Sequence, residues 1–307
     1  MLFRNLHLYR FTKPFSMSAD QLQEALAKSA SRPCGRGELF TVGWAEPLGL
    51  MGQLLVHQTD GRLMICMRRE DKVLPASMVR ECLAEKVVAL EGERGRPVGY
   101  KERLSIKDEI IHDLLPQAFV RSNHTFAYID SAKGWLAVDA ASSRRSEDLI
   151  AMLRKSIGTL DVVLPSLNYS PAAVMTQWLS DDKSIPTSFA IEDECELVGS
   201  GEFNSVVKCK NQDMGADEIV AHLKAGKQVK RLALEWNERI SFILMDDFVI
   251  RRLRFSDAIK AELNDAAEDD ASRFDADFAL MGAELDGLIS SLIQALGGED
   301  ESRYPAS

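Results

Sequence analysis

Residues 54–68 read LLVHQTDGRLMICMR, two apolar runs on either side of a Thr-Asp-Gly segment. Glycine tolerates a positive φ, and Asp-Gly between apolar runs is a strong short-range signal for a β-hairpin. Pro75 follows, and its fixed φ suits the first turn of a helix, which we expect over the run SMVRECLAEKVVAL. This stretch therefore predicts two antiparallel strands followed by an amphipathic helix.

The same order of elements recurs twice further along the chain. TFAYID and WLAVDA flank a turn and precede the helical run SEDLIAMLRKSIG, for which we expect Ser146 as the N-cap and Gly158 as the C-cap. RISFILM and VIRRLRF flank an Asp-Asp turn and precede a helix that Ser256 and Asp257 should cap. Hairpins followed by helices predict an α+β fold with mainly antiparallel sheet, built from repeated β-hairpin–helix units.

Further helices are expected between the first two units and at the end of the chain. GERGRPVGYKERLS, rich in glycine and basic residues, leads into the helical run IKDEIIHDLLPQAF, which predicts a protruding αα-hairpin. Its second helix should end near Pro116, because proline has no backbone N–H to donate, and Phe119 then lies at a corner just past it. The final helix should bury one apolar stripe and stop at Gly297 and Gly298. The stripe contains Met281, Leu285, Leu288, Ile289, Leu292, Ile293 and Leu296.

The net charge of -10 at first disfavours nucleic-acid binding, since phosphate contacts normally need a basic surface. The acidity is local, however. Residues 262–307 contain twelve acidic and two basic side chains, whereas residues 1–261 contain 35 of each. A basic face elsewhere on the molecule is therefore compatible with the composition.

Common catalytic motifs are missing from the sequence. No P-loop, G-x-S-x-G or H-E-x-x-H motif occurs, the five histidines lack ligand spacing, and the five cysteines form no C-x-x-C pair. We interpret the cysteines as reduced packing residues and expect no metal site. The best enzymatic candidate is RFDADF, where Asp275 and Asp277 resemble the paired carboxylates of magnesium-dependent nucleases. The alternative is that both carboxylates stabilise and cap the start of the final helix.

Basic residues gather in the second half of the chain at strand spacing. In VVKCKNQ, Lys208, Lys210 and Gln212 recur at every second residue, so a strand would present all three on one face. In VIRRLRF, Arg252 and Arg254 share a face while apolar residues take the other. Two strands with basic faces are typical of a sheet that contacts phosphates, although an ordinary solvated sheet face has the same pattern. Aromatic residues do not alternate with these bases, so base stacking is not indicated.

Several stretches are distinctive in their order along the chain: MLFRNLHLYRF, RPCG, GWAEPLG, RREDKVLP, LRKSIGTL, AGKQVKRLALEW and RFDADFALMGAEL, the last followed by LGGE. Together they resemble the RdgC family across essentially the whole chain. The resemblance implies a ring-shaped homodimer with one contact between base regions and one between protruding tips. It also implies a positively lined hole that accommodates single- and double-stranded DNA without sequence preference. By occupying DNA, such a protein limits the RecA recombinase in recombination and replication. The resemblance implies that there is also no cofactor and no catalytic centre.

With this resemblance we expect three units in the chain. Residues 1–75 and 119–165 form a central α+β domain, residues 76–118 a helical tip domain and residues 166–307 a base domain. Phe119 matches the family's tip aromatic, which packs against the partner subunit, and a core phenylalanine is the alternative.

The resemblance also assigns residues to the DNA-lining region. Relatives often continue the basic stretch where this chain has Asn211, so the local charge is expected to be lower here. The expected DNA-lining residues are Lys210, Gln212 and Lys227, extended by Arg69, Lys72, Lys208 and Lys230, and the strand pattern adds Arg252 and Arg254.

Two other functional classes stay open. One is the magnesium-dependent nuclease that uses Asp275 and Asp277. The other is a protein adaptor that contacts recombinase through the acidic C-terminal region. The opening MLFRNLHLYRF carries Arg4 and Arg10 where a signal peptide needs an apolar run, so we expect a cytoplasmic, nucleoid-associated protein with no membrane contact.

Overall fold

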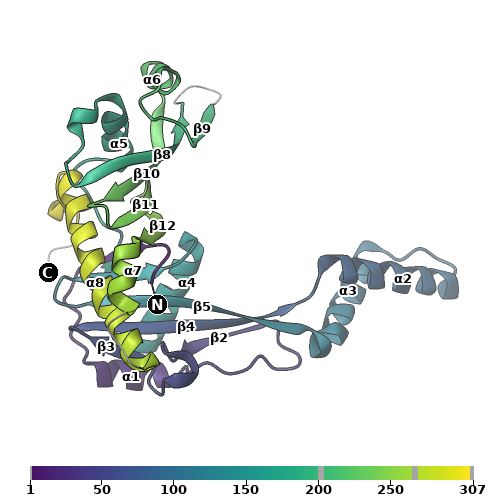
Figure 1. Cartoon of the computed structure of the whole chain (residues 1–307). Helices are drawn as coiled ribbons and strands as arrows, with labels where there is room; N and C mark the ends of the chain where they lie inside the picture. Colours follow the sequence, from purple (N-terminus) through teal and green to yellow (C-terminus); the bar gives the residue numbers. More distant parts are fainter. Residues whose placement is uncertain (1, 200–203, 265–268, 305–307) are drawn as a thin grey trace.

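The computed structural model describes residues 2–199, 204–264 and 269–304. Figure 1 shows an L-shaped molecule, in which two sheets form the body and a long arm leaves one of them and ends in a pair of helices. The described residues contain eight α-helices, and both sheets are antiparallel. The predicted α+β class with antiparallel sheet is therefore confirmed. Of the acidic residues near the C-terminus, Asp265 and Glu268 lie outside the described residues.

The central sheet contains seven strands: β1 (His7–Phe11), β2 (Phe40–Ala45), β3 (Val56–Thr59), β4 (Arg62–Val73), β5 (Phe119–Asp130), β6 (Trp135–Asp139) and β7 (Val162–Val163). They pair in the order β2-β4-β5-β6-β1-β7, and β3 pairs with β4. Helices α1 (Ala19–Ala27) and α4 (Ser143–Ile157) pack on one face, where Leu22 and Leu149 join Trp44 in a closed apolar core. Burial of this face holds the register, because a slip by one residue would turn the apolar side chains to solvent.

The predicted turn between the first two paired strands is confirmed. Asp60 and Gly61 connect β3 to β4 with φ angles of 48° and 76°. A two-residue hairpin turn of this kind needs a positive φ at both central residues, and glycine and aspartate are among the residues that accept it most readily.

Helix α4 begins one turn earlier than the sequence pattern predicted. Its N-cap is Ser142, whose side chain accepts the backbone N–H of Arg145 at 3.5 Å, so the prediction of Ser146 was wrong. Ser146 is buried inside the helix with its Oγ 2.9 Å from the Tyr9 hydroxyl. Two serines one helical turn apart both fit a cap, and burial against β1 decides between them. Gly158 ends the helix with a φ of 88°, as predicted.

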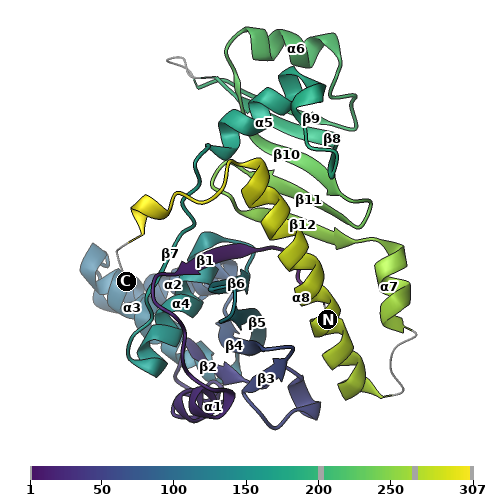
Figure 2. The ribbon, with the colours of Figure 1, turned by 90° about the vertical axis from the view of Figure 1, so that its left-hand side faces the viewer.

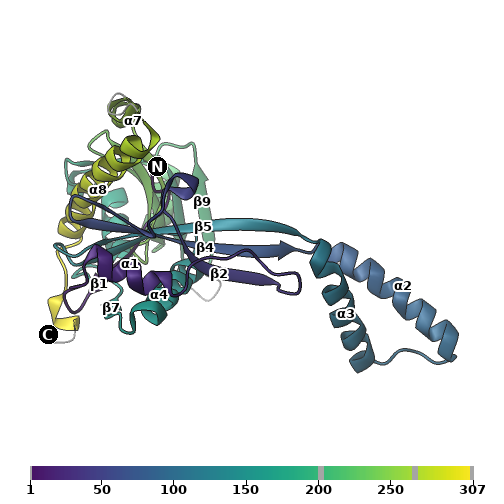
Figure 3. The ribbon, with the colours of Figure 1, turned by 90° about the horizontal axis from the view of Figure 1, so that it is seen from below.

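The arm is the outer part of β4 and β5, and β2 accompanies it by pairing with β4 as far as Asp71 (Figure 3). The two strands stay paired without a bulge from Arg62 opposite Asp130 to Val73 opposite Phe119. A straight ribbon of this length carries the tip well away from the body.

Two helices form the tip of the arm. Helices α2 (Ala76–Arg94) and α3 (Tyr100–Leu114) pack against each other as the predicted αα-hairpin, and the 3-10 turn η2 (Leu115–Gln117) contains Pro116 and ends it where expected. Their shared core is small and separate from the rest of the molecule. It consists of Val79, Val87, Ile106 and Ile110 with partly buried neighbours.

The base sheet contains five strands: β8 (Phe189–Val198), β9 (Val206–Lys210), β10 (Gln228–Trp236), β11 (Ile240–Met245) and β12 (Ile250–Phe255), in the order β12-β11-β10-β8-β9. Helices α5 (Pro171–Ser180) and α8 (Asp270–Ala295) lie in front of one face of this sheet in Figure 2. The core between them includes Trp178, Phe242 and Leu285. Two shorter helices, α6 (Asp217–Lys224) and α7 (Asp257–Asn264), complete this half of the chain.

Helix α8 joins the two sheets. Its residue Phe278 packs near Tyr128 of the central sheet, and Asp286 forms an ion pair with Arg62 of β4. Gly297 and Gly298 end the helix with φ angles of 83° and 88°, as predicted. The predicted stripe is confirmed, because Met281, Leu285, Leu288, Ile289, Leu292 and Leu296 are buried and Ile293 is partly buried.

The remaining short elements are the 3-10 turns η1 (Gly49–Met51), η3 (Asp182–Ser184) and η4 (Glu301–Arg303). Cys66, Cys195 and Cys209 are buried, which agrees with the packing role predicted for the cysteines. Within the described ranges, no helix has the length and apolar character needed to cross a membrane.

Candidate nucleic-acid interface

The uncovered face of the base sheet carries four of the eight predicted basic residues: Lys208, Lys210, Arg252 and Arg254. On β9, Lys208 and Lys210 are exposed while Cys209 between them is buried, as the alternation predicted. Burial raises the pKa of the neighbouring Cys195 thiol to about 12, which keeps that core cysteine protonated. Gln212 lies beyond the end of β9, where it lines a hollow beside Trp178.

Strand β12 contributes arginines to the same sheet. Arg252 and Arg254 are exposed, and Leu253 and Phe255 are buried, so the predicted division of faces is confirmed. Arg252 adopts a φ of 53°, at a position where the pairing of β11 with β12 is irregular. For Arg254 the described part of the chain provides no ion-pair partner.

One carboxylate on β8 brings the separate strands together. Glu194 lies 2.8 Å from Arg231 of β10, 2.9 Å from Arg252 and 3.8 Å from Lys210. The first two distances are charge-assisted hydrogen bonds and the third is a longer ion pair. The contact with Arg252 places β12 and β9 residues around one side chain although other strands separate them in the sheet order.

A second carboxylate extends this network. Glu196 lies 3.2 Å from Lys208 and 3.8 Å from Arg231. The base-sheet cluster, as we call these six side chains, therefore has four cations against two carboxylates and a net charge of two positive. Glu194, Glu196 and Arg231 were not among the candidate site residues. In IEDECELV the acidic residues Glu194 and Glu196 are two positions apart, and this strand spacing could have predicted that both lie on one face of the sheet.

The other two predicted base-domain lysines have separate partners. Lys227 donates from Nζ to the Ser205 hydroxyl and to its backbone oxygen at 3.4 Å. Lys230 is 2.6 Å from Asp246 in the turn between β11 and β12. Lys230 also falls at an irregularity in the pairing of β10 with β8. Neither lysine joins the base-sheet cluster.

The two predicted residues of the arm lie apart from the base sheet and from each other. Arg69 and Lys72 are three positions apart on β4, so their side chains leave opposite faces of the strand. Arg69 pairs with Asp71 at 2.8 Å and its guanidinium lies 4.2 Å from the centre of the Phe40 ring. Lys72 donates to the backbone oxygen of Ala118, at 3.5 Å.

Phe119 is the first residue of β5, and 86% of its surface is exposed. It stands opposite Val73, which is also exposed, at the end of the arm where the tip helices begin. Within the described subunit Phe119 is thus not a core residue, which removes the alternative to a surface role.

The two aspartates of the nuclease alternative lie inside α8. Asp269 is the N-cap and accepts the N–H groups of Ala271 and Ser272, so the interpretation of Asp275 and Asp277 as caps was wrong. Asp275 lies 3.2 Å from Nε2 of His57 and accepts a hydrogen bond from Thr59, both on β3. Across the described residues there is no group of three or more His, Cys, Asp or Glu side chains that could hold a metal ion.

Comparison with protein-family models matches residues 1–299 to the family described as "Putative exonuclease, RdgC". The chain belongs to the RdgC family. Relatives named "Recombination-associated protein RdgC" include those of Aeromonas hydrophila, 47% identical over 98% of this chain and 100% of the relative, and Tolumonas auensis, 44% identical over 97% and 99%. A third relative, from Yersinia enterocolitica, is 43% identical over 97% of this chain and 98% of its own length. The predicted resemblance to the RdgC family is confirmed.

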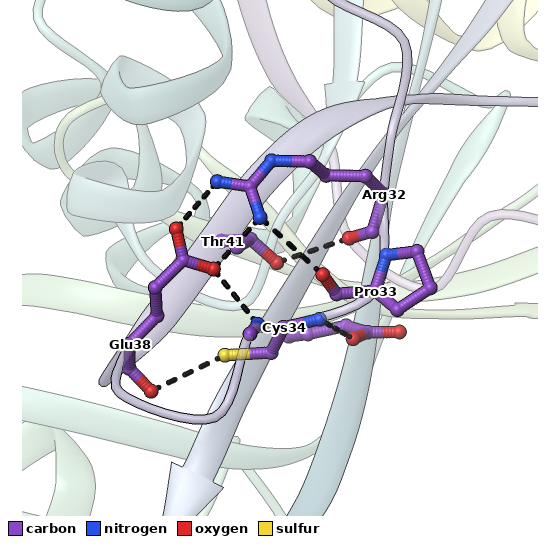
Figure 4. A network of polar contacts seen from close by, with 7 residues as sticks. Arg32, Pro33, Cys34, Glu38 and Thr41 are labelled. Carbon is purple, nitrogen blue, oxygen red and sulfur yellow. Dashed lines mark hydrogen bonds and ion pairs between the residues drawn. The ribbon is translucent and has the colours of Figure 1, made fainter.

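One stretch that carried the RdgC resemblance, RPCG at residues 32–35, lies in a tight loop beside the outer part of β4 (Figure 4). Arg32 donates to a carboxylate oxygen of Glu38 at 2.7 Å, and the backbone N–H of Gly35 donates to the same oxygen at 2.8 Å. These two hydrogen bonds lower the pKa of Glu38 to about 2. The N–H of Cys34 donates to Glu70 of β4 at 2.8 Å, so the loop is fastened to the first strand of the arm.

Proposed function

We propose that this protein is a non-enzymatic, ring-shaped homodimer that encloses DNA without sequence preference and thereby limits a RecA-type recombinase. The single observation that carries the proposal is the base-sheet cluster, with its excess of positive charge on an uncovered sheet face. Lysine and arginine contacts to phosphate carry no sequence information, because every nucleotide presents the same phosphate.

The shape of the subunit supports enclosure. Figures 1 and 2 agree that α5 and α8 cover the side of the base sheet that is turned away from the arm. The uncovered face therefore lies in the inner angle of the L. Two such subunits, related by a two-fold axis and touching at their bases and tips, would surround a central opening. The exposed Phe119 is the proposed apolar anchor of the tip contact.

The family supports the biological context. The curated relatives are named for association with recombination, and a protein that occupies DNA competes with any filament-forming recombinase for the same strand. Contacts made mainly to phosphate would serve single and double strands alike. Residence with the nucleoid in the cytoplasm is part of the same proposal. No cofactor is part of this mechanism.

Retention on circular DNA tests enclosure directly. The dimer is loaded at low salt on a nicked circular plasmid and on the same plasmid cut once, and both are washed with high salt. We expect the circle to keep the protein while the linear form loses it from its ends. Equal loss from both forms would overturn enclosure, and a strong preference among random duplexes would overturn phosphate recognition.

A nuclease is the second candidate, because the matching family description contains the word exonuclease. In that case Asp275 and Asp277 would hold magnesium, and Asp275 would first have to leave His57. Incubation of plasmid and linear duplex with the protein and magnesium separates the two functions, since a nuclease shortens DNA and a ring only retards it.

An adaptor acting through the acidic C-terminal region would keep its function without binding DNA. Deleting residues 299–307, of which 305–307 lie outside the described residues, and measuring DNA retention distinguishes the adaptor from the ring.

A further inference from the structure

We infer that Glu194 and Glu196 are built-in competitors of DNA phosphate, which weaken each contact of the base sheet with the backbone. The inference rests on the proposed function and adds to it the residues that set the strength of DNA binding. Both acids lie on β8, and their side chains are only 16% and 20% exposed, beneath the ends of the longer basic side chains.

The ion pairs are set by the backbone. In the antiparallel register Glu194 stands opposite Lys210, and Glu196 stands between Lys208 on β9 and Arg231 on β10. Side chains at directly opposite positions of neighbouring strands leave the same face within contact distance. The pairing of each acid with its cations therefore follows from the strand register and does not depend on one chance side-chain rotamer.

The two carboxylate oxygens of Glu194 are both engaged. Oε1 lies 2.8 Å from Arg231 and 3.8 Å from Lys210, and Oε2 lies 2.9 Å from Arg252. A phosphate that approaches these cations offers the same kind of acceptor and must compete for them. An arginine has five N–H donors, so it can contact the phosphate with the remaining donors but with its charge partly balanced.

The consequence for binding is a reduced number of effective charges. DNA meets a cluster with a net charge of two positive, where the four cations alone would present four. Each effective phosphate contact adds about one to the slope of log K against log salt. A ring that retains DNA by enclosure does not need tight contacts, and weak ones allow it to move along the duplex.

The test replaces each acid by its neutral amide in the full-length dimer. The variants are Glu194→Gln and Glu196→Gln, and the matched control is Glu192→Gln. Glu192 is on the same strand and undergoes the same change of charge, but it lines the hollow beside Trp178 and has no ion-pair partner among the residues the structure describes. Affinity for a labelled duplex of arbitrary sequence is measured by fluorescence anisotropy at four salt concentrations.

We expect Glu194→Gln to bind about three- to tenfold more tightly than the wild type at moderate salt, with a steeper salt dependence by about one. Glu196→Gln, which loses two cationic partners instead of three, should show a smaller gain, and Glu192→Gln should bind like the wild type. Thermal unfolding confirms that each variant is folded, and if Glu194→Gln is not, Glu196→Gln alone decides.

Unchanged or weaker binding by a folded Glu194→Gln or Glu196→Gln would overturn the inference, because the acids would then position the cations for DNA instead of competing with it. An equal gain in Glu192→Gln would also overturn it, since the effect would be one of general charge. If the wild type fails to bind duplex at any salt concentration, the proposed function itself is wrong. That outcome is distinct from a wild type that binds normally while the variants do not differ from it.

Discussion

His7 is a histidine of β1 with only 3% of its surface exposed, and its Nε2 finds no hydrogen-bond partner among the described residues. Burial lowers the pKa of its imidazole below the ordinary value, and the nearby Asp247 partly opposes this effect. The neutral form is therefore favoured in the folded state, while the unfolded chain takes up a proton near pH 6.5. Above pH 6.5 the folded protein keeps the full stability that neutral His7 contributes. This stability is lost as the pH falls from 6.5 toward the lowered pKa of His7 in the folded protein.

A His7→Gln variant tests this linkage. Urea unfolding at pH 7.5 and pH 5.5 should show a smaller acid-induced loss of stability in the variant than in the wild type, because glutamine takes up no proton. The other titrating groups are common to both proteins and cancel in the comparison. Equal losses would show that His7 titrates in the folded protein as it does in the unfolded chain.

At the residue scale, the sequence could reveal which cations share a strand face but not what neutralises them. Lys208 and Lys210 are two positions apart, so a local rule predicts their common side. Their partners Glu194 and Glu196 come from another strand, and the register that brings them together depends on the folded sheet. The sequence therefore predicted three cations of the cluster, but neither Arg231 nor the two carboxylates that pair with them.

At the scale of elements, one glycine decides how β2 packs. A Cβ on Gly43 would lie 2.3 Å from the backbone Cα of Ser31 and 2.6 Å from its nitrogen. The segment around Ser31 is held there by its own N–H, which donates to Trp44 at 2.6 Å. Backbone cannot yield as a flexible side chain can, so any larger residue must push this segment off the strand.

Gly43→Ala is expected to lower the free energy of unfolding by about 2–3 kcal/mol through this overpacking. The matched control is Gly92→Ala in α2, where an added Cβ meets nothing within 4 Å. In a helix the same change should raise stability by about 0.5–1 kcal/mol. Chemical denaturation of both variants provides the measurement, and a Gly43→Ala variant as stable as the wild type would contradict the packing account.

The elements that could be predicted are those with a local cause. Asp60-Gly61 required positive φ, Pro116 ended a helix, and the stripe of α8 had the period of a buried helix. The prediction failed where the local signal was ambiguous and distant packing decided. Ser146 was predicted as the cap of α4, but it is covered by β1 and Ser142 caps the helix instead. Helix α8 begins at Asp270, further upstream than the carboxylates predicted to mark its start.

At the scale of the whole molecule, Phe119 is the expected weak point of the proposed ring. Because its side chain is exposed in the subunit, Phe119→Ser should change the stability of the fold by less than about 0.5 kcal/mol. If it anchors the tip contact, its loss should weaken that contact by about 2 kcal/mol or more, roughly thirtyfold in Kd.

Leu50→Ser is the matched control, since Leu50 is a fully exposed apolar residue in the η1 turn of the body. Analytical ultracentrifugation measures the dimer, and a salt-washed circular plasmid measures retention. Phe119→Ser should lose retention on the circle while Leu50→Ser keeps it. Unaltered retention in both variants would exclude Phe119 from ring closure.

The continuous path of β4 and β5 from the arm into the middle of the central sheet has a mechanical consequence. A pull on the tip along the arm loads β4 against β2 and β3, and β5 against β6, in shear. Hydrogen bonds loaded in shear must break together, whereas those of a peeling strand break one after another. In the proposed ring, the arm would therefore transmit tension from threaded DNA to the joints between subunits.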